Sequence, residues 1–235
     1  NAGACLANKT QAVEFIKDKG GIIGVEAKDE LSGEKFSIRA NVVVNAAGAW
    51  SNKIVKMDEA DAPAITRPTK GIHIIYRRLP HTRAILLSAH KDKRIFFVIP
   101  WRGLTLIGTT DADYAGSLDD VYASTDEVEY LLEETRRIFL DEDIGKKGII
   151  TTYASLRPLV NPALSNFVAF LRSRKGGVNT QGKPAWQVSR EHLIRESHSG
   201  LLSVVGGKYT TYRHLAEQVV DLALSKIAGR NFKKC

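Results

Sequence analysis

The residues best suited to binding an anion lie together between Gly206 and Arg213. A strand-like apolar segment, 201–205, leads into this stretch, and a helix is predicted to begin within it. Helix starts offer unpaired N–H groups and a positive dipole, and glycine allows close approach, which favours an anion or an electron-rich oxygen. A plain strand–turn–helix junction has the same pattern, so both interpretations stay open. The candidate binding residues are Gly206, Gly207, Lys208, Thr210 and Thr211.

Two arginines stand at the ends of strand-like segments, where a guanidinium offers a planar pair of donors to a phosphate or carboxylate. Arg157 precedes Pro158, which holds the arginine backbone extended. Arg190 follows the segment 185–189 and precedes Glu191. Arginine side chains are mostly exposed, so a surface ion pair is the alternative for each, with Glu191 as the partner of Arg190.

The six histidines show no spacing typical of a metal site, and the sequence contains neither Gly-x-Ser-x-Gly nor Cys-x-x-Cys. A zinc site and a hydrolase nucleophile are therefore not indicated, and we expect no metal.

The elements that must position these residues begin with strands. Segments 20–28 and 35–40 predict a hairpin. The near-continuous apolar run 41–46 predicts a strand buried on both faces. It ends in the small residues Ala46-Ala47-Gly48, which allow a sharp turn, and a short helix is predicted over 50–57.

The middle of the chain predicts an antiparallel sheet, because its strand-like segments have short connections. These segments are 72–76, 84–88, 94–99 and 104–108. A helix follows, because Ser124 and Glu127 form a capping box. Its apolar stripe is Val128, Leu131, Leu132, Thr135, Ile138 and Phe139.

Strands are also predicted over 149–156, 166–171, 185–189 and 201–205, and a final helix over 210–228. The polar, glycine-rich segment 173–184 is predicted to be a mobile hairpin loop.

Composition is that of a globular protein, because 43% of the 235 residues are hydrophobic. The two cysteines, Cys5 and Cys235, exclude a disulfide scaffold and fit a reducing compartment. No apolar run approaches the roughly 20 residues that cross a bilayer, and no signal-peptide pattern opens the sequence. Met57 is the only methionine, so we expect a piece of a longer protein.

Charge is unevenly distributed along the chain. Segment 67–94 holds eight basic residues and one acid, whereas 111–143 holds twelve acids and two basic residues. The basic segment is either a solvated face or a surface for an anionic partner. Its basic residues alternate with apolar ones and not with aromatic stacking residues, so nucleic acid is not expected.

Six motifs, taken in order and with their spacing, resemble FAD-dependent glycerol-3-phosphate dehydrogenase, the respiratory, quinone-reducing family. Together they cover nearly the whole chain. The motifs are Asn41-Val-Val-Val-Asn-Ala-Ala-Gly-Ala-Trp50, Lys70-Gly-Ile-His73, Arg94-Ile-Phe-Phe-Val-Ile-Pro-Trp101, Ile107-Gly-Thr-Thr-Asp111, Ser155-Leu-Arg-Pro-Leu159 and Gly206-Gly-Lys-Tyr-Thr-Thr-Tyr-Arg213.

The resemblance implies an α+β fold, that of the α/β flavoproteins of the D-amino-acid-oxidase type. Part of a Rossmann-like FAD domain, residues 1–66 and 199–235, would flank a substrate domain, residues 67–198, built on a large, mostly antiparallel sheet with flanking helices. The family's opening Gly-x-Gly-x-x-Gly motif, which binds the FAD pyrophosphate, and its C-terminal helical domain have no counterpart in this sequence. We therefore expect the isolated chain to lack FAD and activity.

The resemblance also implies site residues. His73 matches the active-site histidine near the substrate hydroxyls and is our candidate base, since histidine titrates near neutrality. Arg157, Arg190 and Lys208 match the cations that hold the glycerol phosphate. The positions that match FAD-binding segments are Ala46, Ala47, Gly48 and Trp50, which close on the cofactor, and Gly206, Gly207, Thr210 and Thr211, whose helix start is directed at the flavin ring.

The implied reaction converts sn-glycerol 3-phosphate to dihydroxyacetone phosphate. A base takes the C2 hydroxyl proton, the C2 hydride passes to flavin, and the electrons pass on to quinone. The implied partners of the parent protein are its substrate, a quinone, a membrane surface to which it binds peripherally and a second copy in a homodimer. Its implied location is cytoplasmic, on the inner face of the cytoplasmic membrane if the source is bacterial.

Two alternatives stay open. One is another flavin-dependent amine or hydroxy-acid oxidase of the same fold, which would bind a carboxylate; three cations favour the phosphate dianion instead. The other is a non-catalytic binding or assembly module that keeps the fold.

Overall fold

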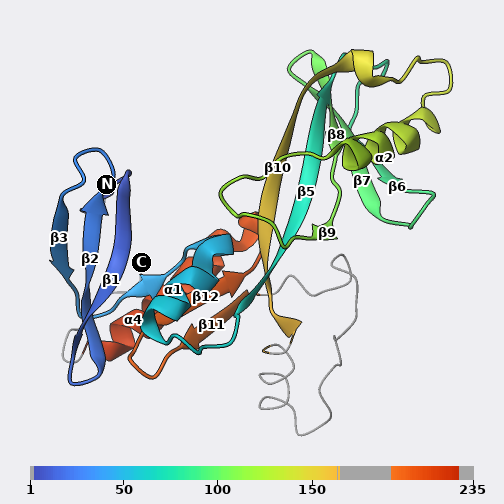
Figure 1. Ribbon diagram of the computed structural model, residues 1–235. Helices are drawn as coiled ribbons and strands as arrows, with labels where there is room; N and C mark the ends of the chain where they lie inside the picture. The colour runs from blue at the N-terminus through green and yellow to red at the C-terminus, as the bar shows by residue number, and fades with distance from the viewer. Residues whose placement is uncertain (1–2, 163, 165–191, 228–235) are drawn as a thin grey trace, which may run out of the picture. The chain divides into compact units, whose positions relative to one another are not determined.

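The computed structural model describes residues 3–162, 164 and 192–227. The chain divides into two compact units (Figure 1). Unit 1 comprises residues 1–66 and 190–235, and unit 2 comprises residues 67–189. The predicted strands 166–171 and 185–189, the predicted loop 173–184 and Arg190 lie outside the described residues.

Unit 1 contains an antiparallel three-stranded sheet of β1 (Thr10–Asp18), β2 (Gly21–Asp29) and β3 (Lys35–Arg39). The predicted hairpin over 20–28 and 35–40 is therefore confirmed as β2 and β3. The additional strand β1 alternates less clearly in sequence, because it carries two irregularities in its pairing with β2.

The second sheet of unit 1 combines antiparallel and parallel pairing, in the order β11 (His192–Glu196), β12 (Leu202–Gly206) and β4 (Val44–Asn45). β11 pairs antiparallel with β12, whereas β4 pairs parallel with it through Leu202–Val44 and Ser203–Asn45. Because β11 belongs to this sheet, unit 1 resumes at residue 190 and not at the predicted residue 199.

The prediction of a strand buried on both faces over 41–46 is wrong. The strand is only two residues long, and Val44 is 40% exposed. Within the described residues, β12 is the one strand that pairs with β4, so β4 lies at a sheet edge, where its apolar side chains are not enclosed.

Two helices of unit 1 pack against β12 (Figure 1). A 3₁₀ turn, η1 (Gly48–Trp50), leads into α1 (Ser51–Asp58), close to the predicted helix 50–57. A second 3₁₀ turn, η4 (Tyr209–Thr211), leads into α4 (Tyr212–Lys226). The last helix thus begins two residues later than predicted, because its entry is a tighter 3₁₀ turn.

A buried carboxylate ties the elements of unit 1 together. Asp58, at the end of α1, accepts hydrogen bonds from Ser199 Oγ at 2.6 Å and lies 2.8 Å from Lys17 Nζ of β1. Burial opposes ionisation of Asp58, but the hydrogen bonds from Lys17, Ser197 and Ser199 outweigh it and lower the pKa. The charged form therefore joins β1, α1 and the β11–β12 turn.

Unit 2 contains the predicted antiparallel sheet, and its strand order is β10, β5, β8, β7, β6, with a short β9 also paired to β5. In Figure 1, β5 and β10 run side by side as the two longest strands. The strands are β5 (Thr66–Tyr76), β6 (Ile85–Ser88), β7 (Ile95–Trp101), β8 (Leu104–Gly108), β9 (Ala112–Asp113) and β10 (Ile149–Val160), the last entered through η2 (Lys146–Gly148).

One face of this sheet packs on α2 (Thr125–Arg136). The predicted capping box is confirmed, because Ser124 and Glu127 hydrogen-bond reciprocally across the first turn. Val128, Leu131 and Leu132 enter the core with the strand residues Ile72, Ile74, Tyr76, Phe96, Val98 and Ile107. Beyond the end of α2 at Arg136 the predicted stripe holds only in part: Phe139 packs against this core, whereas Ile138 is 47% exposed.

The basic segment of unit 2 forms ion pairs with the acidic one. Among the pairs that join them are Arg67 with Asp113, Lys70 with Glu127 and Arg77 with Glu142. The charge asymmetry seen along the sequence is therefore partly neutralised within the unit.

Candidate active site

Arg157 of β10 lies over β5 and contacts the connection between β8 and β9. Its Nη2 donates to Thr109 Oγ1 at 2.8 Å and to the Thr110 carbonyl at 3.2 Å, and its Nη1 lies 3.3 Å from Asp111 Oδ1. The Asp111 side chain is 3% exposed and that of Arg157 21%. The guanidinium is thus held in one orientation by a buried carboxylate while part of the side chain stays accessible.

A glycine makes room for this guanidinium. A Cβ on Gly71 would collide with Nη1, Nη2 and Cζ of Arg157. Arg157 therefore lies directly on the backbone of β5, two residues from His73. Only glycine allows this approach, because any side chain at position 71 would occupy the space of the guanidinium.

His73 is packed flat on the neighbouring strand in the same way. A Cβ on Gly108, its partner across β5 and β8, would collide with the imidazole. The ring of Tyr153 stacks on the His73 ring with centroids 4.9 Å apart and planes inclined by 10°. His73 Nδ1 is buried and has no hydrogen-bond partner within the described residues.

Burial and the neighbouring charge of Arg157 both lower the pKa of His73. The imidazole is therefore neutral near pH 7, with a nitrogen available to accept a proton. A neutral imidazole beside a fixed guanidinium can bind an anionic substrate and accept a proton from a hydroxyl group. The structure thus brings together His73 and Arg157, which sequence motifs far apart in the chain had indicated.

In unit 1, the two turns predicted to contact the cofactor lie at the same end of the mixed sheet. The Ala46-Ala47-Gly48 turn follows β4, and Gly206-Gly207 ends and follows β12; these strands are parallel neighbours, so their carboxyl ends meet. Ligands of α/β sheets bind at such carboxyl ends. Gly48, Gly206 and Gly207 have φ angles of +57°, +77° and +90°, which favour glycine. A Cβ on Gly48 would meet no atom within 4 Å, so the backbone there is accessible.

The other predicted residues of unit 1 lie beside these turns. Trp50 is exposed at the end of η1. Lys208, Thr210 and Thr211 are exposed around η4, and Thr211 Oγ1 donates to the Lys208 carbonyl at 3.0 Å. The threonine hydroxyl at position 211 thus stabilises the turn itself.

Several residues of both sites were not assigned roles from sequence. Asn45 is buried and holds the first turn: its Oδ1 accepts from Ala47 N, and its Nδ2 donates to Ser203 Oγ, each at 3.2 Å. The sequence signal for this role of Asn45 was a polar residue inside an otherwise apolar run. In unit 2 the polar run Thr109-Thr110-Asp111, directly after an apolar strand, was the corresponding signal for the partners of Arg157. Gly71 and Gly108 lie inside motifs that carry the family resemblance, but their role and that of Tyr153 depend on strand pairing and could not be read from the sequence.

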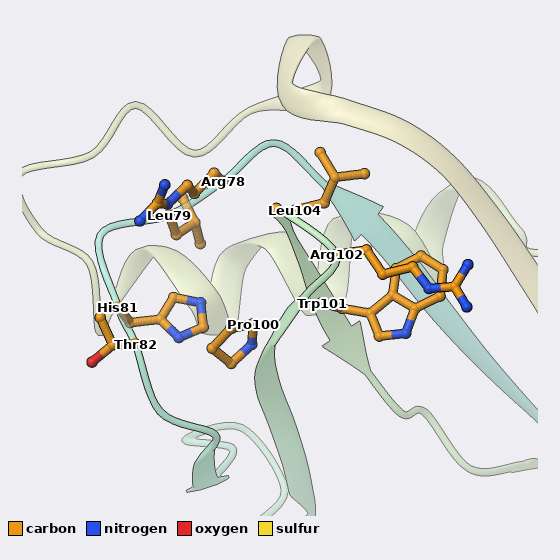
Figure 2. Close-up of a pocket in the computed structure, with 9 residues that line it drawn as sticks. Arg78, Leu79, His81, Thr82, Pro100, Trp101, Arg102 and Leu104 are labelled. Atoms are coloured by element: carbon orange, nitrogen blue, oxygen red, sulfur yellow. The ribbon is translucent and has the colours of Figure 1, made fainter.

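A concave region of unit 2 lies at the β7–β8 turn, away from His73 and Arg157 (Figure 2). Its volume is about 360 Å³, and it is lined by Arg78, His81, Trp101 and Arg102 among others. Arg102 lies over the Trp101 ring at 5.1 Å, at the β7–β8 turn. Both arginines are exposed, as on an ordinary solvated surface, so we assign no site to it.

Parallel strands whose turns lead into helices are the arrangement in which α/β proteins bind ligands at the carboxyl ends of strands. The same chain has a large antiparallel sheet that carries an imidazole and a guanidinium. Residues 1–213 match the family described as FAD dependent oxidoreductase. The chain belongs to this family, whose members depend on FAD.

Within this family, the chain is similar to proteins named glycerol-3-phosphate dehydrogenase. The chain is 32% identical over 228 residues to the aerobic glycerol-3-phosphate dehydrogenase of Staphylococcus haemolyticus, covering 96% of this chain and 38% of that one. It is 31% identical over 231 residues to the mitochondrial glycerol-3-phosphate dehydrogenase of Mesocricetus auratus, covering 94% and 29%. The chain thus spans roughly a third of the length of these relatives.

Solved structures confirm the α+β fold of the D-amino-acid-oxidase type. The X-ray structure of the Bacillus halodurans glycerol-3-phosphate dehydrogenase complexed with FAD matches with a TM-score of 0.80 and 28% identity, covering 97% of this chain and 40% of that one. The L-proline dehydrogenase of P. horikoshii matches with a TM-score of 0.61 at 15% identity, covering 94% and 50%, and shows the fold alone.

The described residues contain no cluster of three or more His, Cys, Asp or Glu side chains that could hold a metal ion. In the same part of the chain, no helix has both the length and the apolar character to cross a membrane.

Proposed function

We propose that this chain is part of an FAD-dependent glycerol-3-phosphate dehydrogenase, which oxidises sn-glycerol 3-phosphate to dihydroxyacetone phosphate. The observation that carries the proposal is the pairing of a neutral imidazole with a fixed guanidinium at one end of the sheet of unit 2. Relatives named glycerol-3-phosphate dehydrogenase and the FAD-complexed Bacillus halodurans structure support it.

Arg157 is the residue that binds the substrate phosphate in this proposal. Its guanidinium presents a rigid fork, and Asp111 and Thr109 fix the orientation of that fork. A phosphate dianion is bound here more strongly than a neutral hydroxyl would be, because a hydrogen bond from the guanidinium to an anion is charge-assisted. Lys208 and Arg190 are proposed as further cations for the phosphate, on the basis of the family resemblance.

His73 is the proposed base for the C2 hydroxyl. Its lowered pKa keeps the imidazole neutral in the resting enzyme, as a base requires. Tyr153 and Gly108 confine the ring between two surfaces, so the imidazole keeps one orientation without a hydrogen bond to Nδ1. When bound, FAD supplies the hydride acceptor for C2.

The turns of unit 1 fit part of an FAD site. Positive φ angles at Gly48, Gly206 and Gly207, and the open space at Gly48, let a ligand approach the backbone closely. The Ala46-Ala47-Gly48 turn and Trp50 are proposed to contact FAD, as are the Gly206-Gly207 turn, Thr210 and Thr211.

The test is anaerobic reduction of the flavin in the full-length holoenzyme. We expect glycerol 3-phosphate to bleach the flavin absorbance near 450 nm in one turnover, whereas glycerol and sn-glycerol 1-phosphate leave it unchanged on the same timescale. Arg157 would equally suit a carboxylate, so proline, glycine and 2-hydroxy acids are the comparison substrates. Faster bleaching by one of these carboxylates would replace the proposal with an amine or hydroxy-acid oxidase, and no bleaching by any substrate would favour the non-catalytic module.

We also propose, from the resemblance, that the parent enzyme passes its electrons to a quinone, binds peripherally to the inner face of the cytoplasmic membrane if bacterial, and is a homodimer. The acceptor is tested by comparing turnover with a water-soluble quinone and with oxygen. Sedimentation with vesicles tests the binding to a membrane surface. Analytical ultracentrifugation tests whether the enzyme is a dimer.

A further inference from the structure

Glu127 makes more contacts than its helix requires. It is the third residue of α2, and its Oε2 accepts from Ser124 N at 3.0 Å as the capping box predicts. The same carboxylate also reaches two residues outside the helix. Its Oε1 accepts from Thr110 Oγ1 at 3.3 Å, and its Oε2 lies 2.8 Å from Lys70 Nζ.

Thr110 connects this carboxylate to Arg157. The threonine is buried, and its Oγ1 accepts from Ile72 N of β5 at 3.1 Å while donating to Glu127. Its carbonyl accepts from Arg157 Nη2 at 3.2 Å. One residue thus contacts Glu127 with its side chain and Arg157 with its main chain.

Lys70 provides a second connection between Glu127 and the site. Its Nζ donates to the Tyr122 carbonyl at 3.1 Å as well as pairing with Glu127. It directly precedes Gly71, the residue on which the Arg157 guanidinium lies. The pair Lys70–Glu127 therefore fixes β5 next to the position that the guanidinium occupies.

The charge of Glu127 is retained despite its surroundings. Its side chain is 15% exposed and that of Lys70 13%. Burial opposes ionisation, but the hydrogen bonds from Lys70 and Ser124 outweigh it and lower the pKa of Glu127. A capping box works equally well with glutamine at this position, so a buried, charge-paired glutamate is more than the cap needs.

We infer that Glu127 is a positioning residue for substrate binding: through Thr110 and Lys70 it holds the β8–β9 connection and β5 so that Arg157 keeps the orientation that receives the phosphate. The inference rests on the proposed function, and specifically on the phosphate role of Arg157.

The test is a double-mutant cycle in the full-length holoenzyme with Glu127→Ala, Arg157→Ala and both together. We expect Glu127→Ala to raise KM for glycerol 3-phosphate about 3- to 10-fold, the size of one hydrogen bond, with kcat and FAD content changed less than twofold. In the Arg157→Ala background, Glu127→Ala should leave KM unchanged, because the residue through which it acts is missing.

Ser124→Ala is the matched control, because it removes the other half of the capping box and leaves the contacts of Glu127 with Thr110 and Lys70. It should lower the melting temperature with KM unchanged. If Glu127→Ala does not fold, the nearly isosteric Thr110→Val is placed in the same cycle, with Thr110→Ser expected to restore KM.

The inference would be overturned if Glu127→Ala raised KM as much in the Arg157→Ala enzyme as in the wild type, or if Ser124→Ala raised KM as much as Glu127→Ala does. Either result would leave the proposed function intact. An Arg157→Ala enzyme with the wild-type KM would overturn the phosphate role of Arg157 and the inference with it.

Discussion

Replacing Gly71 with alanine tests whether the guanidinium of Arg157 must lie on the backbone of β5. The added Cβ would collide with the end of the Arg157 side chain and with no backbone atom among its nearest neighbours. Gly71 does not have a positive φ angle, so alanine suits the backbone. The protein should therefore fold, and the arginine should move.

The magnitude follows from what the moved guanidinium loses. One charge-assisted contact to the substrate phosphate contributes about 1.5–3 kcal/mol, which corresponds to about 10- to 150-fold in KM. Removal of the whole side chain in Arg157→Ala should give the upper part of this range. A displaced guanidinium still carries its charge, so Gly71→Ala should give the lower part, about 10-fold.

The assay is steady-state oxidation of glycerol 3-phosphate by the full-length holoenzyme, with FAD content measured on the same samples. Gly145→Ala is the matched control, since a Cβ there meets no atom within 4 Å and its φ of −140° suits alanine. An unchanged KM in Gly71→Ala would refute the reasoning. So would an effect of Gly71→Ala on KM in the Arg157→Ala enzyme as large as its effect in the wild-type enzyme.

Three further predictions concern charge and cofactor. Because burial and, after it, the Arg157 charge lower the pKa of His73, the acid limb of kcat/KM should lie below pH 6.5 and move upward in Arg157→Ala; a limb that stays in place would remove His73 as the titrating base. Lys208→Met should weaken turnover of glycerol 3-phosphate and leave the very poor turnover of glycerol nearly unchanged, so an unchanged ratio of the two kcat/KM values would mean that Lys208 does not contact the phosphate. The isolated 235-residue chain should purify colourless, because the sequence lacks the Gly-x-Gly-x-x-Gly motif; stoichiometric flavin absorbance between 350 and 500 nm would contradict this.

Local signals predicted local structure well. The capping box at Ser124 and Glu127 identified the start of α2 correctly, because both partners lie within one turn of helix. The apolar stripe was a weaker guide, because two of its members lie beyond the helix: Phe139 packs on the core, but Ile138 is exposed. The prediction of a buried strand over 41–46 was wrong for a related reason: hydrophobicity indicates burial only where other elements are present to cover the apolar side chains.

The candidate site could be predicted only in part. Its place at a strand end before Pro158 singled out Arg157 as a candidate anion-binding residue, and the family resemblance singled out His73, but neither showed that Arg157 affects the pKa of His73. That proximity depends on β10 and β8 pairing on either side of β5, which is a property of the sheet. The two glycines that admit these side chains, Gly71 and Gly108, lie within motifs of the resemblance, but the reason for them could not be read from the sequence, since the need for them arises across strands.

The internal ion pairs of unit 2 have a consequence for its response to ionic strength. Arg67, Lys70 and Arg77 are already paired with Asp113, Glu127 and Glu142, so these cations are not free to condense on a polyanion. Screening should act chiefly on the two more exposed pairs, and the more enclosed Lys70–Glu127 pair should persist to higher salt. These three cations should therefore contribute little to the salt dependence of heparin or anionic-vesicle binding. A membrane surface that attracts the protein electrostatically would have to act on other basic residues.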